Sequence, residues 1–365
     1  MKFKLLILFC LLCLVISCAS DDEDEQTEIS DSDKTEEIND SLPVPDTETA
    51  EDAENEQEQS NDEDYSETPD SFCYAGGALL YEGDSQFKLC PGDSEKFQKQ
   101  LCKDGKWVDE GDCVSGSVTI PAGSFKMGCD KEVEGNCPED TVPVHEVALS
   151  SYVMDKFEVP VELFELCIAE NVCTNDDPER PHFRTSAESD KCNIGNSERK
   201  NHPVNCVTWY GAKTYCEWLG KRLPTEAEWE NAAKSGKDQI YPWGNSPAAS
   251  CDNTVMKSSA NGCGSNTTSP IGSKPEGASL TGIQDLSGNV SEYTNDWYEK
   301  KFYSTEDASK ADTQGAAEPE KDKFKVIRGG SYIYGENHAR SSFRGSAKLD
   351  DPAIDFGFRC VSSPK

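Results

Sequence analysis

The chain carries its most informative stretch at residues 222–230, Arg222-Leu223-Pro224-Thr225-Glu226-Ala227-Glu228-Trp229-Glu230 (RLPTEAEWE). Thr225 and Glu228 form the pattern of a capping box, in which each side chain accepts a hydrogen bond from a backbone N–H at the start of a helix. The sequence therefore predicts a helix that opens here and runs to Lys234. Gly236, just beyond it, is of the residue type that commonly follows a helix.

Shorter elements precede this helix. Residues 118–127 (VTIPAGSFKM) and 144–157 mix apolar and turn residues in the manner of short antiparallel strands. Residues 159–170 are predicted as a helix. Residues 207–219 are predicted as another, with an apolar face formed by Trp209, Ala212, Cys216 and Leu219. The long stretches between these elements have no regular pattern, which is uncommon in a compact domain unless the loops are functional or cross-linked.

Several longer motifs occur in order around residues 222–230. They are Trp209, Tyr215-Cys216-Glu217-Trp218, Tyr241-Pro242-Trp243-Gly244, Gly288-Asn289-Val290, Arg328-Gly329-Gly330-Ser331 and Phe356-Gly357-Phe358-Arg359-Cys360. Together they resemble the formylglycine-generating enzyme family, also called the sulfatase-modifying factor family, over residues 117–361. The resemblance implies an α+β fold that is irregular, related to C-type lectins and poor in regular secondary structure.

The resemblance also implies where catalysis would take place. Family enzymes oxidise a cysteine of a client sulfatase to formylglycine, using two copper-binding cysteines that follow the Arg-Gly-Gly-Ser motif. Aligned from Arg328, those positions hold Tyr334 and Ala339, and neither a phenol nor a methyl group can replace a thiolate as a ligand for Cu(I). Ser291 also stands where many members have tryptophan. We therefore expect no catalytic residues, no bound copper and no parent oxidase activity.

Other metal chemistry has little support in the sequence. The four histidines are scattered without HxxxH or HxH spacing, so a zinc or iron centre is not expected. The resemblance does imply structural calcium, a hard cation bound by oxygen ligands. One set falls on Asp285, Gly288, Val290 and Glu292, where the first and last would give side chains and the others backbone carbonyls. A weaker set without a carboxylate falls on Asn253, Thr254, Asn261 and Cys263. Spacing alone would favour loops held by Asx turns.

The segment that would occupy the family's active-site groove is rich in residues suited to recognition. Tyrosine and arginine provide large amphipathic contacts, so this composition favours ligand binding. The alternative for each residue is an ordinary polar loop position. The candidate groove residues are Ser331, Tyr332, Tyr334, Glu336, Asn337, His338 and Arg340.

The cysteines indicate an exported, oxidised protein. Beyond Cys18 fourteen cysteines remain, without any CxxC pair, which favours disulfides over a metal site. The family resemblance implies the pair Cys216 and Cys360. Neighbours along the chain are expected to pair as Cys129–Cys137, Cys167–Cys173, Cys192–Cys206 and Cys251–Cys263. For the first four, a faint resemblance to a sushi module favours Cys73–Cys102 and Cys90–Cys113, although spacing leaves three connectivities open.

The N-terminus has the pattern of an export signal. A charged start is followed by an apolar run over residues 5–16, which is too short to span a bilayer, since that takes ~20 residues. Val15-Ile16-Ser17-Cys18 then resembles the bacterial lipobox, so we predict a lipoprotein signal peptide at residues 1–17 and lipidation of Cys18. An ordinary signal peptide is the alternative.

A strongly acidic segment follows. Residues 21–70 contain 23 Asp and Glu and one Lys, which accounts for −22 of the net charge of −34. Such a composition cannot bury enough apolar surface to fold, so residues 18–70 are predicted to be a disordered tether. A small four-cysteine module at 71–115 and the family-like domain at 116–365 complete the predicted organisation. Nucleic acid is not an expected partner, because this charge repels phosphates.

The function favoured by the sequence is a non-catalytic scaffold that binds a protein or a small-molecule ligand. The lipid anchor would hold it to a membrane in the cell envelope, at the outer membrane or the cell surface. One alternative is an oxygen-dependent enzyme of the same family, such as a formylglycine-generating oxidase. Another is a structural envelope role in which the tether acts as a spacer.

Overall fold

The computed structural model describes residues 72–75, 78–81, 85–91 and 93–364, which belong to one compact unit, Tyr65–Lys365. The predicted signal peptide, Cys18 and the acidic tether lie outside the described residues. So does the side chain of Cys73. Among the described residues, no helix combines the length and the apolar character needed to cross a membrane.

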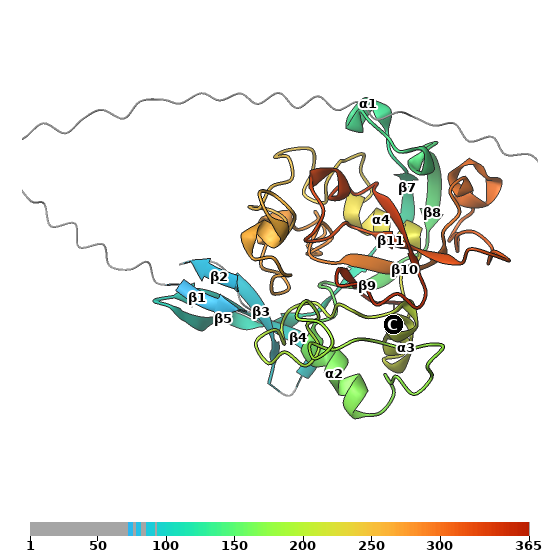
Figure 1. The fold of residues 1–365 in the computed structure, drawn as a ribbon. Coiled ribbons are helices and arrows are strands. Elements are labelled where there is room, and N and C mark those ends of the chain that lie inside the picture. The colour runs from blue at the N-terminus through green and yellow to red at the C-terminus, as the bar shows by residue number, and fades with distance from the viewer. Residues whose placement is uncertain (1–71, 76–77, 82–84, 92, 365) are drawn as a thin grey trace, which may run out of the picture. The chain divides into compact units, whose positions relative to one another are not determined.

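Two small antiparallel sheets come first along the described chain (Figure 1). β1 pairs with β2, and β4 lies between β3 and β5. The strands are β1 (Phe72–Ala75), β2 (Ala78–Tyr81), β3 (Ser85–Cys90), β4 (Asp93–Lys103) and β5 (Lys106–Ser115).

The β3–β4–β5 sheet shares a hydrophobic core with the chain that follows it. Phe87 and Phe97 are buried against Phe157 and Ile271. The ring centroids of Phe87 and Phe97 lie 4.7 and 5.1 Å from that of Phe157. A sheet of this size buries too little apolar surface to be stable alone, and this contact supplies the missing part of its core.

The larger part of the chain contains three further sheets. A four-stranded sheet has the order β12-β11-β10-β13, a three-stranded sheet has the order β14-β9-β6, and β7 pairs with β8. The strands are β6 (Ser117–Ile120), β7 (Gly123–Met127), β8 (His145–Leu149), β9 (Tyr152–Asp155), β10 (Ser291–Trp297), β11 (Phe324–Arg328), β12 (Arg344–Lys348), β13 (Phe356–Gly357) and β14 (Val361–Ser362).

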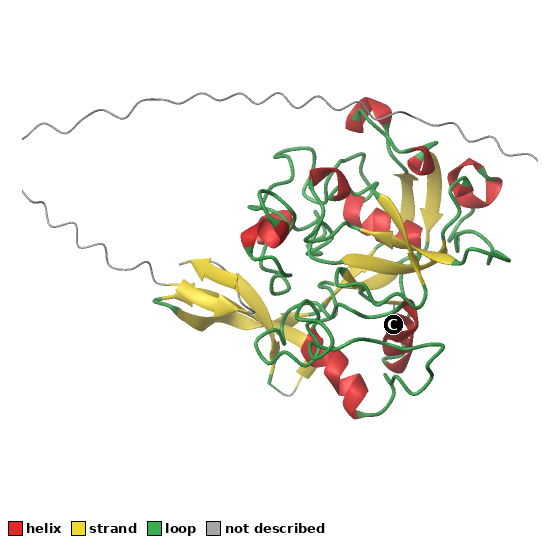
Figure 2. Ribbon diagram, viewed as in Figure 1, coloured by secondary structure: helices red, strands yellow, loops and turns green. Residues whose placement is uncertain are grey.

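The helices are short, and irregular loops make up most of the remaining chain (Figure 2). The α-helices are α1 (Lys131–Glu134), α2 (Val161–Ala169), α3 (Trp209–Trp218) and α4 (Glu226–Lys234). The 3-10 helices are η1 (Glu139–Thr141), η2 (Asn261–Gly264), η3 (Pro275–Gly277), η4 (Phe302–Ser304), η5 (Glu306–Ser309) and η6 (Glu336–His338).

The predicted capping box is confirmed at the start of α4. The Thr225 hydroxyl accepts from Glu228 N at 3.1 Å, and the Glu228 carboxylate accepts from Thr225 N at 2.8 Å. Ser235 follows the helix in the left-handed conformation, and Gly236 after it also has a positive φ. Every residue of α4 is buried, so this helix runs through the interior and packs against β10 and β11 (Figure 1).

The predicted strands at residues 118–127 and 144–157 and the predicted helices at 159–170 and 207–219 are confirmed as β6 to β9, α2 and α3. The placement of Leu219 on the apolar face of α3 is wrong. The helix ends at Trp218, and Leu219 is 42% exposed. Tyr215 fills the core instead, stacked on Phe164 with 5.6 Å between ring centroids. The chain leaves helical geometry before position 219 can face inward.

The disulfides of the large domain follow the expected pairing. Cys216–Cys360 ties α3 to the end of the chain across 144 residues. The other bonds are Cys129–Cys137, Cys167–Cys173, Cys192–Cys206 and Cys251–Cys263. In the first sheet region Cys90 is bonded to Cys113, and Cys102 is also in a disulfide. Its expected partner, Cys73, has no described side chain.

Candidate functional site

The segment between β11 and β12, residues 329–343, contains the candidate groove residues, and two buried arginines hold its ends. Arg328 donates to Glu230 at 2.6 Å and to Glu226 at 3.1 Å. Arg344 donates to both oxygens of Glu226, at 2.6 and 3.0 Å. Helix α4 therefore clamps the start and the end of this segment through two carboxylates.

The electrostatics of the clamp depend on full burial. Burial opposes the ionisation of Glu230, but Lys234 and Arg328 outweigh that effect and lower its pKa to about 2. Lys234 lies 2.8 Å from the other Glu230 oxygen. A buried carboxylate with two buried cations and no water to replace them is costly to disturb, so the clamp makes the base of the segment rigid.

The predicted groove residues separate into an exposed set and a buried set. Tyr334 is 37% exposed and stacks on His338, with 4.6 Å between ring centroids and 14° between planes. Burial lowers the pKa of His338, which favours its neutral form. The side chains of Glu336 and Asn337 are exposed on the same short turn. We call Tyr334, Glu336, Asn337 and His338 the aromatic turn.

Ser331 and Tyr332 were also predicted to line the groove, and the structure buries both, since each is 1% exposed. Ser331 donates its hydroxyl hydrogen to Asp355 at 2.9 Å. Tyr332 donates its backbone N–H to the Asn289 carbonyl at 2.9 Å, and burial raises the pKa of its hydroxyl to about 12. These long-range contacts turn both side chains inward.

Arg340 lies at the edge of the aromatic turn and has a structural partner that the sequence did not reveal. Its guanidinium donates to the carbonyls of Glu134 and Asn136, at 3.0 and 3.2 Å. These carbonyls belong to the loop closed by Cys129–Cys137. The partners are more than 200 residues away along the chain, so no local pattern could have connected them.

Tyr241 and Trp243 also lie beside the segment and were not among the candidate groove residues. Their rings stack at 4.9 Å with 4° between planes. Ser341 donates its backbone N–H to the carbonyl of Ile240. Both residues belong to the Tyr-Pro-Trp-Gly motif, and this motif was the sequence signal that could have identified them.

The two positions that align with the family's cysteines have different environments. Ala339 is 2% exposed and belongs to a small core with Tyr241, Ala249 and Met256. Tyr334 is exposed. Every cysteine whose side chain the structure describes is in a disulfide, so no free thiol faces the aromatic turn among those residues. The described side chains of the site can offer stacking and hydrogen bonding.

The first predicted calcium set fits a cation only in part. Glu292 accepts from Arg359 through both of its oxygens, at 2.7 Å each, and from the indole of Trp229 at 2.9 Å. Asp285 accepts from the backbone N–H of Gly272 at 2.7 Å. The Asp285 carboxylate and the carbonyl oxygens of Gly288 and Val290 remain as possible oxygen ligands for calcium. Calcium binding at this set stays a prediction.

Three side chains of the second calcium set, those of Asn253, Thr254 and Cys263, have partners within the protein. The Asn253 amide oxygen accepts from Ser250 N, and the Thr254 hydroxyl donates to the Ser287 carbonyl. Cys263 is bonded to Cys251, so it would contribute its backbone carbonyl alone. Among the described residues, no three side chains of His, Cys, Asp or Glu converge in a way that could hold a metal ion.

Comparison with known proteins agrees with the order of motifs. The chain is 34% identical over 252 residues to the serine/threonine-protein kinase pkn1 of Chlamydia pneumoniae, covering 67% of this chain but 38% of that protein. It is 32% identical over 296 residues to the formylglycine-generating enzyme of Thermomonospora curvata, covering 69% of this chain and 94% of that enzyme. Among solved structures it is similar to PvdO from Pseudomonas aeruginosa, at 26% identity and a TM-score of 0.54, over 67% of this chain and 93% of PvdO.

The fold and these similarities converge on one family. The described sheets, short helices and long cross-linked loops form the irregular α+β fold expected for it. The sequence pattern of the sulfatase-modifying factor enzyme 1-like domain matches residues 108–364. The chain therefore belongs to the sulfatase-modifying factor enzyme 1-like domain family.

Proposed function

We propose that this protein is a binding member of its family, which recognises a protein or small-molecule ligand through the aromatic turn and carries out no thiol-dependent oxidation. The observation that carries the proposal is the absence of a free thiol among the cysteines with described side chains. Tyr334 and buried Ala339 stand where the family resemblance places the two reactive sulfurs.

The aromatic turn has properties that favour recognition. Its backbone is held by the buried ion pairs of Arg328 and Arg344, while the Tyr334–His338 stack is left partly exposed. A rigid aromatic pair loses little conformational entropy when a ligand binds, and tyrosine is enriched among residues that dominate binding energy. Exposed Glu336 and Asn337 beside it add hydrogen-bonding groups.

We also propose that the protein is exported and anchored to a membrane of the cell envelope by lipid on Cys18, at the outer membrane or the cell surface. Support comes from the lipobox-like Val15-Ile16-Ser17-Cys18 and from the disulfides of the described domain, which form in oxidising compartments. The acidic segment at residues 21–70 would act as the tether.

The activity arm of the test uses the purified chain, loaded with Cu(I) under reducing conditions and mixed with a cysteine-containing sulfatase peptide. We expect no stoichiometric copper binding and no aldehyde product by mass spectrometry. The formylglycine-generating enzyme of Thermomonospora curvata serves as the positive control. Conversion of the peptide by this chain would favour the enzymatic alternative, to which the 32% identity with that enzyme lends weight.

The binding arm screens the same chain against peptide and glycan libraries. Ligands that depend on the aromatic turn should be lost with Tyr334→Ala. They should be retained with Tyr210→Ala, which removes a partly buried tyrosine from α3. If both variants recover the same ligands in equal amounts, the aromatic turn is not the binding site.

Anchoring is tested separately, by labelling cells with a fatty-acid analogue and fractionating their membranes. The wild-type chain should carry the label and sediment with membranes, and Cys18→Ala should do neither. An unlabelled wild-type chain in the soluble fraction would contradict the anchor.

A further inference from the structure

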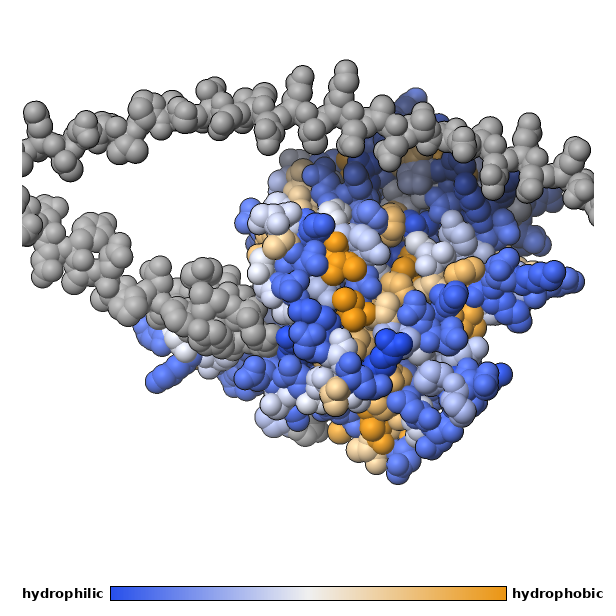
Figure 3. Space-filling view, in the orientation of Figure 1, coloured by the Kyte–Doolittle hydropathy of each residue, from blue (hydrophilic) through white to orange (hydrophobic). Residues whose placement is uncertain are grey.

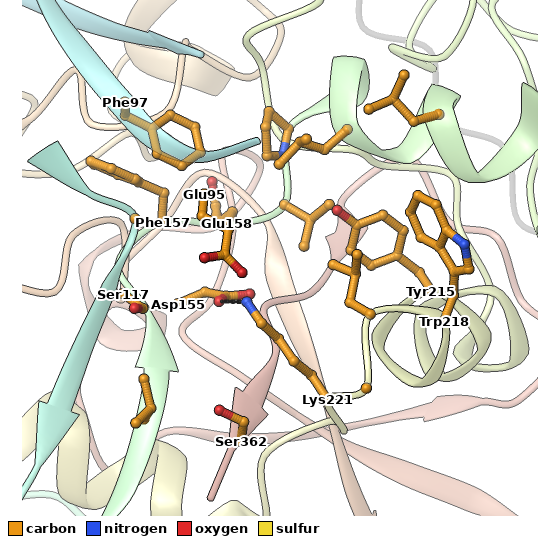
Figure 4. A pocket seen from close by; sticks show the side chains of 18 of the residues that line it. Glu95, Phe97, Ser117, Asp155, Phe157, Glu158, Tyr215, Trp218, Lys221 and Ser362 are labelled. Carbon is orange, nitrogen blue, oxygen red and sulfur yellow. Dashed lines mark hydrogen bonds and ion pairs between the residues drawn. The ribbon is translucent and has the colours of Figure 1, made fainter. Parts of the chain in front are cut away.

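A cavity of about 460 Å³ lies away from the aromatic turn and shares no residue with it. Its walls come from β4, β6 and β9, from α2, from the end of α3 and from the last residues of the chain (Figure 4). The volume is within the ~300–1,000 Å³ typical of small-molecule sites. Nothing derived above makes use of this cavity.

Aromatic rings stand on two sides of the cavity. Phe97 and Phe157 form one side, and Tyr215 and Trp218 form the other, with 5.7 Å between the ring centroids of the second pair (Figure 4). The Phe157 ring already has the ammonium of Lys156 at 5.4 Å. The Trp218 indole is held in orientation by its N–H, which donates to Glu170 at 3.1 Å.

The rim of the cavity exposes two large apolar side chains. Leu166 is 47% exposed and Leu219 is 42% exposed. In the space-filling view, apolar residues form patches in the centre of the visible face and at its lower edge, near α2 (Figure 3). Exposed apolar side chains that adjoin a concave site are a common mark of ligand binding.

A tyrosine hydroxyl points into this space. Tyr215 lines the cavity and is 1% exposed. In the close view the hydroxyl is directed toward the middle of the cavity (Figure 4). A phenolic oxygen can accept a hydrogen bond, so a ligand with a polar hydrogen could donate to it.

The lining carries more carboxyl groups than cations. Glu95 and Asp155 contribute carboxylates, burial raises the pKa of Glu158 well above its usual value and favours its neutral form, and Lys221 is the one cationic residue among the described residues of the lining. Lys221 is already paired with Asp155 at 2.6 Å. Outside residues 21–70, the rest of the chain carries a net charge of −12, which is −34 less the −22 of that segment. An anionic ligand would therefore be repelled both on approach and inside the cavity.

We propose that this cavity binds a small organic cation, namely an ammonium group attached to an apolar or aromatic body. The indole of Trp218 attracts a cation, and the Tyr215 oxygen can accept a hydrogen bond from an ammonium N–H. The apolar body would cover Leu166 and Leu219. The chemistry of the rings, the rim and the charge all favour the same class of molecule.

The test measures binding of phenethylammonium and of phenylpropionate to the full chain by isothermal titration calorimetry. These probes have similar aromatic bodies and opposite charges. We expect phenethylammonium to bind at least about tenfold more tightly, and Tyr215→Phe to weaken it. Equal binding of both probes, preference for the anion, or failure of the cation to bind would overturn the proposal.

Charge changes on the rim provide a matched control. Leu219→Lys should weaken the cation roughly fivefold to tenfold by repulsion, and Leu219→Glu should strengthen it. Leu280→Lys, at a leucine that is 54% exposed and outside the lining, should leave affinity unchanged. Identical affinities for the two Leu219 variants would also contradict the assignment. Tyr334→Ala should have no effect, which separates this site from the aromatic turn.

Discussion

The Tyr334 ring lies nearly parallel to the His338 imidazole, with 14° between their planes and 4.6 Å between centroids. The contact joins the first residue of the aromatic turn to the last. Phe343 also packs against His338, with 4.6 Å between the ring centroids. His338 therefore links the exposed tyrosine to the better-packed end of the segment.

This stack should make the segment sensitive to acid. Burial lowers the pKa of His338, so its contribution to stability is present above the unfolded-state pKa and is lost as pH falls through the lower folded-state value. We expect His338→Phe, which keeps the stacking, to lose less stability than wild type between pH 7.5 and 5. Urea denaturation at several pH values measures this. Parallel pH profiles would contradict it.

Glu230→Ala should be strongly destabilising, because it leaves Arg328 and Lys234 buried without their carboxylate. Breaking a buried ion pair from one side costs ~3–5 kcal/mol. The matched control is Glu217→Ala, which removes an exposed pair with Lys213 and should cost roughly 0.3–0.5 kcal/mol. Urea denaturation gives the unfolding free energies of the two variants. If both variants lose a similar amount of stability, the buried ion pairs of Glu230 do not stabilise the fold as predicted.

The Cys216–Cys360 disulfide should contribute more to stability than the Cys167–Cys173 disulfide. Their partners are 144 and 6 residues apart, and the chain-entropy relation gives about 5 and about 2 kcal/mol for loops of these lengths. Replacing both cysteines of each pair by alanine and measuring denaturant midpoints tests the order. A larger loss from the short loop would mean that packing rather than chain entropy dominates.

Because of Asp296, we expect the free energy of unfolding to fall as pH rises. Burial raises its pKa to about 8, with Glu226 adding to the effect, so its stabilising contribution is full below the unfolded-state value of 3.8 and is lost as pH rises through 8. Asp296→Asn keeps an acceptor for the N–H of Glu226 and should flatten the fall between pH 5 and 8, by on the order of a few kcal/mol. Asp238→Asn at the surface serves as the control, and its denaturation profile should match wild type.

Calcium should raise the melting temperature modestly if Asp285 and its neighbouring carbonyls hold it. The expected dependence follows from binding to the folded state alone. Asp285→Asn keeps an acceptor for Gly272 N–H but removes the charge, and it should abolish the calcium-dependent shift. A shift of unchanged size in Asp285→Asn would exclude this set, and no shift in wild type would exclude the prediction as a whole.

Much of the fold could be predicted because its signals are local. The capping box at Thr225 requires partners three residues apart, and the short disulfide loops join near neighbours. The motif order was sufficient to predict the family's irregular α+β fold and the Cys216–Cys360 bond.

The sequence by itself determined where α4 begins, how cysteines close along the chain pair and which side chains the aromatic turn contains, because neighbouring residues decide these features. Tertiary structure alone decided that Ser331 and Tyr332 turn inward, that Leu219 faces out and that Arg340 reaches the carbonyls of a loop near residue 135. It also brought α2, α3 and β4 together around a cavity. Such outcomes depend on which surfaces are buried against one another, and burial is a property of the packed chain rather than of any segment within it.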